Sequence, residues 1–329
     1  MSTKINPDRL RGLVAAALAS PSVHNVQPAR WKIDGDALIL LEDPSRRLSV
    51  GDPRGNDAAI SLGAAAEGVA IAASGEKLTT HVERLSGMHG RLHAIARLTF
   101  KGRGKPDPLL PALSERASWR GDFTPPSPDD RVGVAALAGD DRTLITDPAA
   151  IADLAARYDA ASFAIMEEAR FRAELRHWMR LKPSHPGWSR DGLNAAAMQL
   201  SGLEATAAGA VLGPLFRPLA ALGLAPALLA EAKSFTNAAG VALFHRPADE
   251  DPFESGRAFH RFWLAIDAAG FGANVLAALA DHRPTAAMLA IDYPVGEGRR
   301  LVSAFRIGRR DGPPFARARL PLDEVLLQG

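Results

Sequence analysis

Three short segments of the chain combine residue types that could hold a small anionic ligand. The segment ERASWRGDF, residues 115–123, places Arg116, Ser118 and Arg120 at alternate positions. Two permanently charged guanidinium groups with a hydroxyl suit a phosphate monoester dianion, because they offer charged, bidentate donors. If a helix continues through Arg120, the two arginines share one of its faces. An exposed helix end that carries arginines is the alternative interpretation.

The second segment, PSVHNVQP at residues 21–28, places a hydroxyl and two amides between two prolines. Ser22, Asn25 and Gln27 offer donors and acceptors together, which suits a planar heterocycle with alternating carbonyl and N–H groups, or a polyol. The prolines restrict the backbone of this loop. Alternatively, Ser22 and Asn25 cap local turns of the backbone.

The third segment, ARARLP at residues 316–321, places two arginines near the C-terminus. In an extended chain Arg317 and Arg319 point to the same side, because side chains alternate. They could complete a phosphate pocket. A solvated tail is the alternative interpretation.

Composition excludes several kinds of chemistry. The 329 residues contain no cysteine, which excludes disulfides, thiolate metal sites and a cysteine nucleophile. The net charge of +2 comes from 39 basic and 37 acidic residues and does not indicate nucleic acid. His81, His89 and His93 lie in segments that read as strands, without an H-E-x-x-H pattern, so we predict no metal site.

The sequence shows no feature that would direct the chain into a membrane. Its first residues lack an apolar signal core. The longest apolar run, residues 215–230, is too short to span a bilayer and is interrupted by Arg217, Pro218 and Pro226. We therefore expect a soluble, cytoplasmic protein that binds neither membrane nor nucleic acid.

Periodicity and turn residues predict the elements that must position these segments. Alternating apolar residues around Asp34-Gly35 indicate a hairpin over 29–42. A polar stretch rich in glycine, lysine and proline, residues 101–108, indicates a linker. The other predicted strands are 77–84, 91–100, 239–245 and 300–307, and the predicted helices are 8–19, 56–74, 109–119, 149–181, 191–233 and 254–269.

An internal repeat suggests two related halves. The stretch 61–77 resembles 254–272, and each is followed by a strand that begins at an arginine. A chance likeness between alanine-rich helices is the alternative. The halves carry different polar segments, since 124–133, at the place equivalent to PSVHNVQP, has no such set of amides. Together they could make one composite site.

These motifs resemble those of the FMN-dependent nitroreductase superfamily. The family pattern Arg-x-Ser-x-Arg/Lys-x-x-Phe matches Arg116 to Phe123, Pro-Ser-x-x-Asn-x-Gln-Pro matches Pro21 to Pro28, and a Lys/Arg-x-Arg-Leu-Pro strand matches Arg317 to Pro321. Their order is permuted, and together with Ser-x-His-Asn this resembles the Acg-like subfamily. The resemblance implies an α+β, nitroreductase-like fold with two fused pseudo-symmetric halves that mimic a dimer.

The resemblance also implies a domain division and a single FMN site. The halves would be 1–105 and 106–329, with a helical insertion at 191–233 that could form a lid over the flavin, or else a core or oligomer interface. A loop near Gly272 to Leu276 would cover the flavin face. The residues implied in cofactor binding are Pro21, Ser22, Val23, Asn25, Gln27, Arg116, Ser118, Arg120, Arg317 and Arg319.

Two functions fit this resemblance. In the first, the chain is an oxidoreductase that passes electrons from NAD(P)H through FMN to an electron-poor acceptor, with no side-chain acid or base obviously required. In the second, it stores or sequesters FMN and turns over little. We expect a monomer that mimics a dimer, or a further homodimer.

Overall fold

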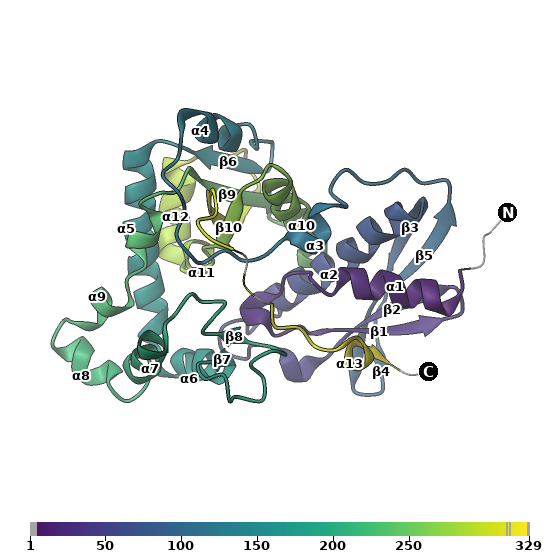
Figure 1. Cartoon of the computed structure of the whole chain (residues 1–329), viewed down its shortest axis with the longest axis horizontal. Helices are drawn as coiled ribbons and strands as arrows, with labels where there is room; N and C mark the ends of the chain where they lie inside the picture. Colours follow the sequence, from purple (N-terminus) through teal and green to yellow (C-terminus); the bar gives the residue numbers. More distant parts are fainter. Residues whose placement is uncertain (1–4, 314, 316, 328–329) are drawn as a thin grey trace.

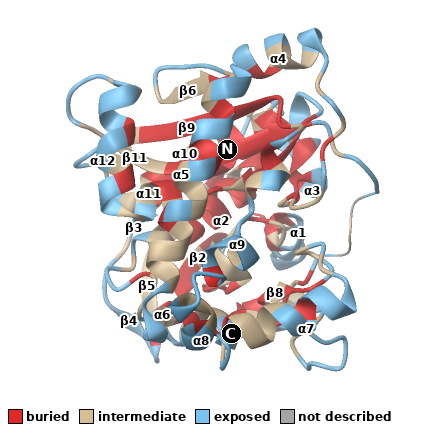
Figure 2. Cartoon of the chain, turned by 90° about the vertical axis from the view of Figure 1, so that its left-hand side faces the viewer, coloured by how far each residue is buried: buried red, intermediate tan, exposed pale blue. Residues whose placement is uncertain are grey.

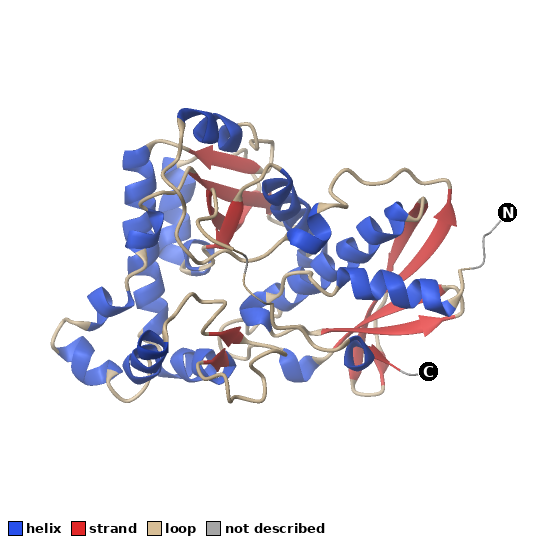
Figure 3. Ribbon diagram, viewed as in Figure 1, coloured by secondary structure: helices blue, strands red, loops and turns tan. Residues whose placement is uncertain are grey.

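The computed structural model describes residues 5–313, 315 and 317–327, so that Ala316 and the first four residues of the chain lie outside the described part. It has α+β architecture, with two larger sheets and a small parallel pair of strands, β7 (Met179–Arg180) and β8 (Leu193–Asn194) (Figure 1, Figure 3). The first sheet has the order β12-β1-β2-β5-β3, with β4 paired to β5. Its strands are β1 Ala29–Asp34, β2 Ala37–Glu42, β3 Leu78–Arg84, β4 Met88–His89, β5 Leu92–Gly102 and β12 Leu326–Leu327.

The predicted hairpin is confirmed, but its turn lies one residue later than expected. Asp34 pairs with Ala37, so the two loop residues are Gly35 and Asp36 rather than Asp34 and Gly35. Gly35 has a φ of 63°, which a residue with a side chain adopts only with strain. The predicted linker 101–108 begins inside β5, which extends to Gly102.

The second sheet is antiparallel throughout and has the order β10-β11-β9-β6. The two predicted strands at 239–245 and 300–307 are confirmed as its central pair. The sequence did not predict its edge strands, which are both only four residues long. The strands are β6 Arg142–Ile145, β9 Gly240–Pro247, β10 Gly272–Val275 and β11 Arg299–Gly308.

Two long helices, α2 (Asn56–Gly75) and α10 (Pro252–Ala268), pack against each other between the sheets (Figure 1). A Cβ on Gly63 would lie 1.9 Å from the carbonyl oxygen of Phe253, and a Cβ on Gly256 would lie 2.1 Å from that of Ile60. Each contact joins a glycine to the residue three positions before the other glycine. The contact is therefore reciprocal, as expected of two pseudo-symmetric halves.

Helix α2 is also the one helix in the described part that is long and apolar enough to cross a membrane. However, 78% of its most apolar stretch is buried inside the protein, and Figure 2 shows it as a buried, central element. It is the core helix of the first half, where it covers the sheet with α1 (Pro7–Ala17).

The helix predicted over 109–119 is wrong in its extent. Helix α3 covers only Ala112–Glu115, because the chain then turns to pair with β10: Ser118 forms a parallel bridge with Ala273, whose carbonyl accepts a hydrogen bond from Trp119. The helix predicted over 149–181 is also interrupted. It forms α5 (Pro148–Met166) and α6 (Ala169–Trp178), and Arg172 donates hydrogen bonds to carbonyls at the break.

The region 191–233 is mostly helical, as predicted, but is built from short pieces. Pro214 lies in the turn between α7 and α8, and Pro218 and Pro226 lie in the first turns of α8 and α9, where their missing N–H groups and fixed φ limit helix length. They are α7 Gly202–Val211, α8 Phe216–Ala221, α9 Ala225–Leu229 and the 3₁₀ helix η3 Ala232–Phe235.

The C-terminal segment leaves the second sheet and returns to the first, where β12 pairs in parallel with β1. Figure 1 shows this yellow segment beside the purple N-terminal elements.

The remaining helices and strands are short. They are η1 Val23–Asn25, η2 Pro44–Arg46, α4 Pro128–Ala135, β7 Met179–Arg180, β8 Leu193–Asn194, α11 Ala278–Asp281, α12 Arg283–Asp292 and α13 Leu322–Val325.

Candidate functional site

The loop Pro21–Pro28 has an unusual backbone. His24, Asn25 and Gln27 all have left-handed conformations, with φ angles of 43°, 54° and 53°. Such conformations cost energy in residues with side chains and persist where the surroundings impose them. One restraint is local, since the Ser22 hydroxyl accepts a hydrogen bond from the Gln27 N–H at 3.0 Å. The capping role considered for Ser22 is therefore present.

The two amides of this loop are used to join distant segments. Asn25 Nδ2 donates to the carbonyl oxygens of Gly192 and Ala318, both at 3.1 Å. Gln27 Nε2 donates to the Arg190 carbonyl at 2.8 Å, and its Oε1 accepts from the Leu320 N–H at 2.9 Å. The loop thus holds the C-terminal segment in place, which is why sequence positions almost 300 residues apart meet here.

Three of the predicted arginines converge at the C-terminal end of α1. Arg319 donates to Asn25 Oδ1 at 2.7 Å and to the carbonyl oxygens of Leu18 at 2.8 Å and Ala19 at 3.2 Å. Arg116 donates to the same Ala19 oxygen at 2.5 Å, and Arg317 donates to the Arg116 carbonyl at 2.9 Å. We call Arg116, Arg317 and Arg319 the arginine cluster.

The arginine cluster carries positive charge that no carboxylate neutralises in the described part of the chain. Arg116 is 2% exposed, and its Nε has no hydrogen-bond partner there. The pKa of Arg116 is lowered first by burial and then by the charges of Arg319 and Arg317. The pKa of Arg319 is lowered to about 10, first by burial and then by the charge of Arg317. Asp267, the acid whose charge raises the pKa of Arg116, is bound to Arg310. An anion would complete this cluster.

Ser118 and Arg120 form no side-chain hydrogen bond with the arginine cluster in the described part of the chain, and they share no partner there. Ser118 Oγ donates to Asn274 Oδ1 at 3.2 Å, on strand β10. The expectation of a loop over Gly272–Leu276 is corrected here, because Gly272–Val275 is a strand in the second sheet. Arg116 and Arg120 do not share a helical face, since the backbone is extended beyond Arg116.

Arg120 belongs to a second group of polar residues with His24, Tyr158 and Glu231. Glu231 is exposed, yet desolvation by the surrounding protein is the largest influence on its pKa and raises it; the charge of Arg120 opposes that shift. Arg120 and Tyr158 are partly exposed, and burial is likewise the largest influence on the pKa of each. We call these four residues the Arg120 group, because the charge of Arg120 affects the pKa of each of the other three.

His24 connects the Arg120 group to the loop. Burial, and secondarily the charge of Arg120, lower the pKa of His24 to about 4, so the imidazole is neutral at pH 7. Its Nδ1 is buried and has no partner in the described part. The sequence left His24 without a role, because only the folded chain brings it near Arg120.

Other residues of this region were missed by sequence reasoning. Arg306 is 1% exposed and donates to the carbonyl oxygens of Ser234, Trp119 and Gly121, so it fixes the backbone around Arg120. Tyr158, Glu231 and Arg306 carry no motif that a single sequence reveals. In the described residues no group of three or more histidine, aspartate or glutamate side chains could hold a metal ion.

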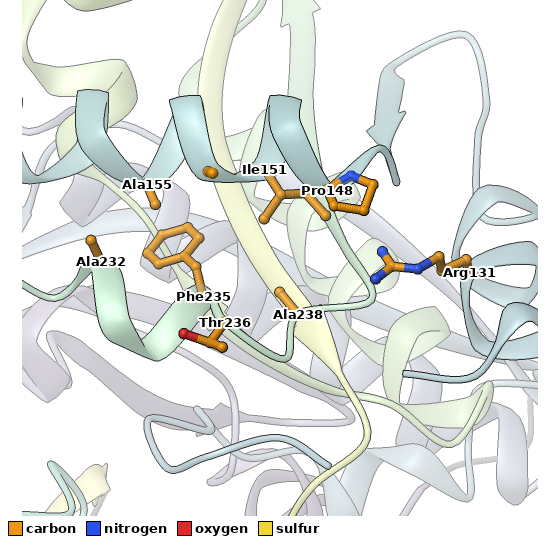
Figure 4. A pocket seen from close by; sticks show the side chains of 9 residues that line it. Arg131, Pro148, Ile151, Ala155, Ala232, Phe235, Thr236 and Ala238 are labelled. Atoms are coloured by element: carbon orange, nitrogen blue, oxygen red, sulfur yellow. The ribbon is translucent and has the colours of Figure 1, made fainter. Parts of the chain in front are cut away.

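Two cavities accompany these features. One of about 200 Å³ lies between α5 and η3, lined mainly by apolar side chains with Arg131 at one end (Figure 4). None of the predicted site residues lines it, so the chemistry of the motifs lies elsewhere. A smaller cavity of about 40 Å³ lies behind the Pro21–Pro28 loop and is lined in part by Ser20, Ser22 and Ser61.

Comparison with known proteins finds similar sequences over part of the chain. No family model matches the chain. Acg of Mycobacterium tuberculosis is 31% identical over 98 residues, which are 30% of this chain and 29% of that protein. Rv3131 from the same organism is 29% identical over 86 residues, 26% of this chain and 25% of that protein. Both are named as NAD(P)H nitroreductases, and the matched stretches span less than a third of each.

Solved structures give weaker likenesses. A protein from Anabaena variabilis described as a nitroreductase aligns over 94% of this chain and 92% of its own, at 9% identity and a TM-score of 0.45. The FMN-dependent nitroreductase NfnB of Mycobacterium smegmatis aligns over 62% of this chain and 88% of its own, at 18% identity and a TM-score of 0.34. The sequence match confirms the resemblance drawn from the motifs: over 98 residues, this α+β chain is similar to Acg, a protein named as an NAD(P)H nitroreductase.

Proposed function

We propose that the chain is an FMN-dependent oxidoreductase that takes electrons from NAD(P)H and passes them to an electron-poor acceptor. The relatives Acg and Rv3131 are named as NAD(P)H nitroreductases, which supports the reaction type. The observation that carries the proposal is the arginine cluster, which is buried or half-buried for the most part and faces no free carboxylate in the described part of the chain.

The residues present fit the phosphate of FMN. Guanidinium groups keep their charge even with a lowered pKa, and a dianion beside Arg116 would supply the partner that its Nε lacks. Ser118 and the Pro21–Ser22–Val23 segment would contact the rest of the cofactor, while Asn25 and Gln27 hold the loop and the C-terminal segment together.

Bound FMN would supply the electron transfer itself, and the protein would bind it, orient it and set its electrostatics. Arg120, on the side of His24 and Glu231, would place a positive charge near the cofactor and favour its reduced, more negative state. His24, neutral at pH 7, would leave that charge undiminished. We assign no proton-transfer role to any side chain in this proposal.

One experiment tests binding and turnover together. The purified chain should be yellow or become yellow with added FMN, and NADPH or NADH added without oxygen should bleach the flavin absorbance rapidly. An electron-poor nitroaromatic compound should then restore the colour. A chain that fails to bind FMN would rule out the proposal.

Storage of FMN is the second candidate, and one observation favours it. The segment 189–192 is bonded to the loop and the C-terminal segment: the Ser189 carbonyl accepts from the Arg319 N–H at 3.1 Å, and the Gly192 N–H donates to the Asn25 carbonyl at 3.1 Å. A closed cover of this kind, with the helices of 191–233 as a lid, would retain flavin and restrict substrates. Flavin that stays yellow for hours with NADPH would support storage instead of turnover.

The domain division, the oligomeric state and the location of the protein are part of the same proposal. The division at residue 105 into two halves that mimic a dimer is supported by the reciprocal contact of Gly63 and Gly256. Further homodimerisation stays open to measurement by light scattering. The burial of helix α2, which removes the one candidate membrane span from lipid, supports a soluble protein, and we propose that it works in the cytoplasm.

A further inference from the structure

The larger of the two cavities lies between α5 and η3 and contains none of the residues assigned to the cofactor. Its volume is about 200 Å³. Its lining consists of the buried residues Ile151, Ala155, Phe235 and Ala238, the half-buried residues Arg131 and Ala232, and the exposed residues Pro148, Ala152 and Thr236. Buried apolar side chains therefore form much of its surface, while solvent can enter past the exposed ones.

Arg131, on α4, supplies the charge of this lining, and most of its hydrogen-bond donors are unused in the described part of the chain. Its Nη1 donates to the Thr146 carbonyl at 2.9 Å. No carboxylate of the described residues lies within 4.0 Å of its nitrogen atoms. A guanidinium has more N–H groups than one carbonyl can accept from, so Arg131 can also donate to a ligand in the cavity.

The acids next to this arginine and its carbonyl partner in the sequence have other partners. Asp130 pairs with Arg309 at 2.7 Å. Asp147 caps α5, where it accepts a hydrogen bond from the Ala150 N–H at 2.9 Å. No direct ion pair with the described residues therefore neutralises the charge at the cavity, which favours an anionic ligand there.

The volume and the walls set the size and shape of the occupant. An apolar cavity of about 150 Å³ holds a benzene ring, so about 200 Å³ leaves room for a ring with one small substituent. Phe235 offers an aromatic wall that a second ring can contact. Figure 4 shows Arg131 at one end of the lining and Ala155 and Ala232 at the other, so the charged end and the apolar end are separate.

We propose that this cavity is a second binding site, which takes a small aromatic carboxylate of about the size of benzoate. The ring would lie against Phe235 and Ile151, where its apolar surface leaves water. The carboxylate would accept two hydrogen bonds from the Arg131 guanidinium, whose planar fork matches it. The inference goes beyond the proposed function, because no residue implied in FMN binding lines the cavity.

Benzoate and its neutral analogue benzamide test the site as a pair. With FMN present in excess, calorimetric titration of wild-type protein should show saturable binding of one benzoate per chain, with a dissociation constant of about 1 mM or less. Benzamide should bind roughly tenfold or more weakly, because it lacks the charge that Arg131 recognises. Neither compound should change the flavin spectrum, which would report a ligand bound beside the flavin instead.

The charge of Arg131 is tested by Arg131→Gln. This variant should bind benzoate roughly tenfold or more weakly than wild type does, and should bind benzoate and benzamide equally within about twofold. Arg217→Gln is the matched control, since Arg217 is an exposed arginine on α8, outside the cavity. It should keep the affinity and the preference of the wild type.

The cavity itself is tested by filling it. In Ala155→Leu the larger side chain should occupy space that the ring needs, so that benzoate and benzamide both lose roughly tenfold or more in affinity. Ala156→Leu adds the same side chain at the neighbouring exposed position of α5, which does not line the cavity, and should bind both compounds as the wild type does.

Three results would overturn the inference. They are a wild-type protein without saturable benzoate binding, an Arg131→Gln variant that still prefers benzoate to benzamide as strongly, and an Ala155→Leu variant with unchanged affinity. Circular dichroism checks that the variants fold, and the two leucine variants still decide the question if Arg131→Gln does not. Flavin titration judges the proposed function separately, because none of these substitutions changes a residue implied in cofactor binding.

Discussion

The buried arginines of this chain differ in their partners. Arg30 is paired with Asp43 at 3.0 Å and Arg180 with Asp191 at 2.7 Å, whereas Arg172 is bonded to carbonyl oxygens. Arg116 is equally buried but is bonded to a carbonyl and lies 4.4 Å from the ring centre of Trp263. Arg116 differs from Arg172 because Arg317 and Arg319 lie beside it and their charges lower its pKa. A buried concentration of positive charge is costly unless something neutralises it, and this marks Arg116 as functional.

The members of the arginine cluster should differ in what they do for stability. Arg317 is exposed, so we expect Arg317→Ala to weaken FMN binding roughly tenfold with little change in the free energy of unfolding. Arg319 is bonded to Leu18, Ala19 and Asn25, so Arg319→Ala should reduce both the affinity for FMN and the free energy of unfolding. Flavin titration and urea unfolding measure the two effects.

A matched control is Arg217→Ala, which removes an exposed arginine on α8 and should alter neither quantity. If Arg317→Ala binds FMN as tightly as wild type, Arg317 is not a phosphate ligand and acts only through its bonds to the Ser114 and Arg116 carbonyls.

Two buried histidines should make stability depend on pH. Burial lowers the pKa of His24 to about 4 and that of His260 to about 3, whereas an unfolded chain binds these protons near pH 6.5. As the pH falls below about 6.5 the unfolded state takes up protons that the folded state does not. Each histidine should therefore lower the free energy of unfolding by on the order of 2 kcal/mol between pH 7 and pH 5.

The variant His260→Asn isolates one of these contributions. Its difference in unfolding free energy from wild type should shrink on going from pH 7 to pH 5, as urea titrations at both values would show. The comparison must be made between the two proteins, because burial raises the pKa of Asp281 to about 6 and so acts in the opposite direction. A difference that stays constant with pH would mean that His260 is protonated in the folded state.

At the scale of the element, the close packing of α2 on α10 depends on two glycines. A Cβ at Gly63 or Gly256 would meet a backbone carbonyl at 1.9 or 2.1 Å, and backbone cannot move aside as a side chain can. We expect Gly63→Ala and Gly256→Ala each to reduce the unfolding free energy by about 3 kcal/mol or more.

Gly12→Ala provides the control within a helix. Gly12 lies in α1 with open space around its Cα, so alanine there should add about 0.5–1 kcal/mol of stability. Thermal or urea unfolding of the three variants compares them. If Gly63→Ala changed the free energy of unfolding in the same way as Gly12→Ala, the helices α2 and α10 would be farther apart than the structure places them.

The elements also show where sequence reasoning succeeds. Helices α2 and α10 were predicted within a few residues, because long apolar runs with small residues leave few other folds open to them. The helix over 109–119 was overestimated, because its end depends on Ser118 pairing with β10, which lies 155 residues away in sequence and on a strand too short to predict.

The site shows the same division. The loop Pro21–Pro28 and the members of the arginine cluster were identified from residue types, and the structure brings them together. Arg120 was grouped with Arg116 by its spacing along a helix that does not extend that far. Glu231 and Tyr158 could not be found, because only long-range packing of α5 and η3 brings them to Arg120.

At the scale of the whole molecule, the two sheets are joined by packing contacts and also by a C-terminal segment that crosses from the second sheet to the first. Strand β12 extends the first sheet, although the residues just before the C-terminal segment belong to the second. The segment in between carries Arg319, which bonds to Asn25 of the first half. Formation of the cluster therefore requires the two halves to be assembled, and binding of a ligand there should stabilise the whole chain.

The difference between the segments Pro21–Pro28 and 124–133 predicts one FMN per chain, although the central helices make a reciprocal contact. The place equivalent to Pro21–Pro28 in the second half has no amides; there Ser127 and Asp130 form a capping box on α4, and Asp130 pairs with Arg309 at 2.7 Å. A carboxylate in that position repels a phosphate. The ratio of flavin absorbance to protein, checked by native mass spectrometry, should give one FMN per chain. Arg319→Ala should lower that value towards zero, and two tightly bound FMN per wild-type chain would contradict a single composite site.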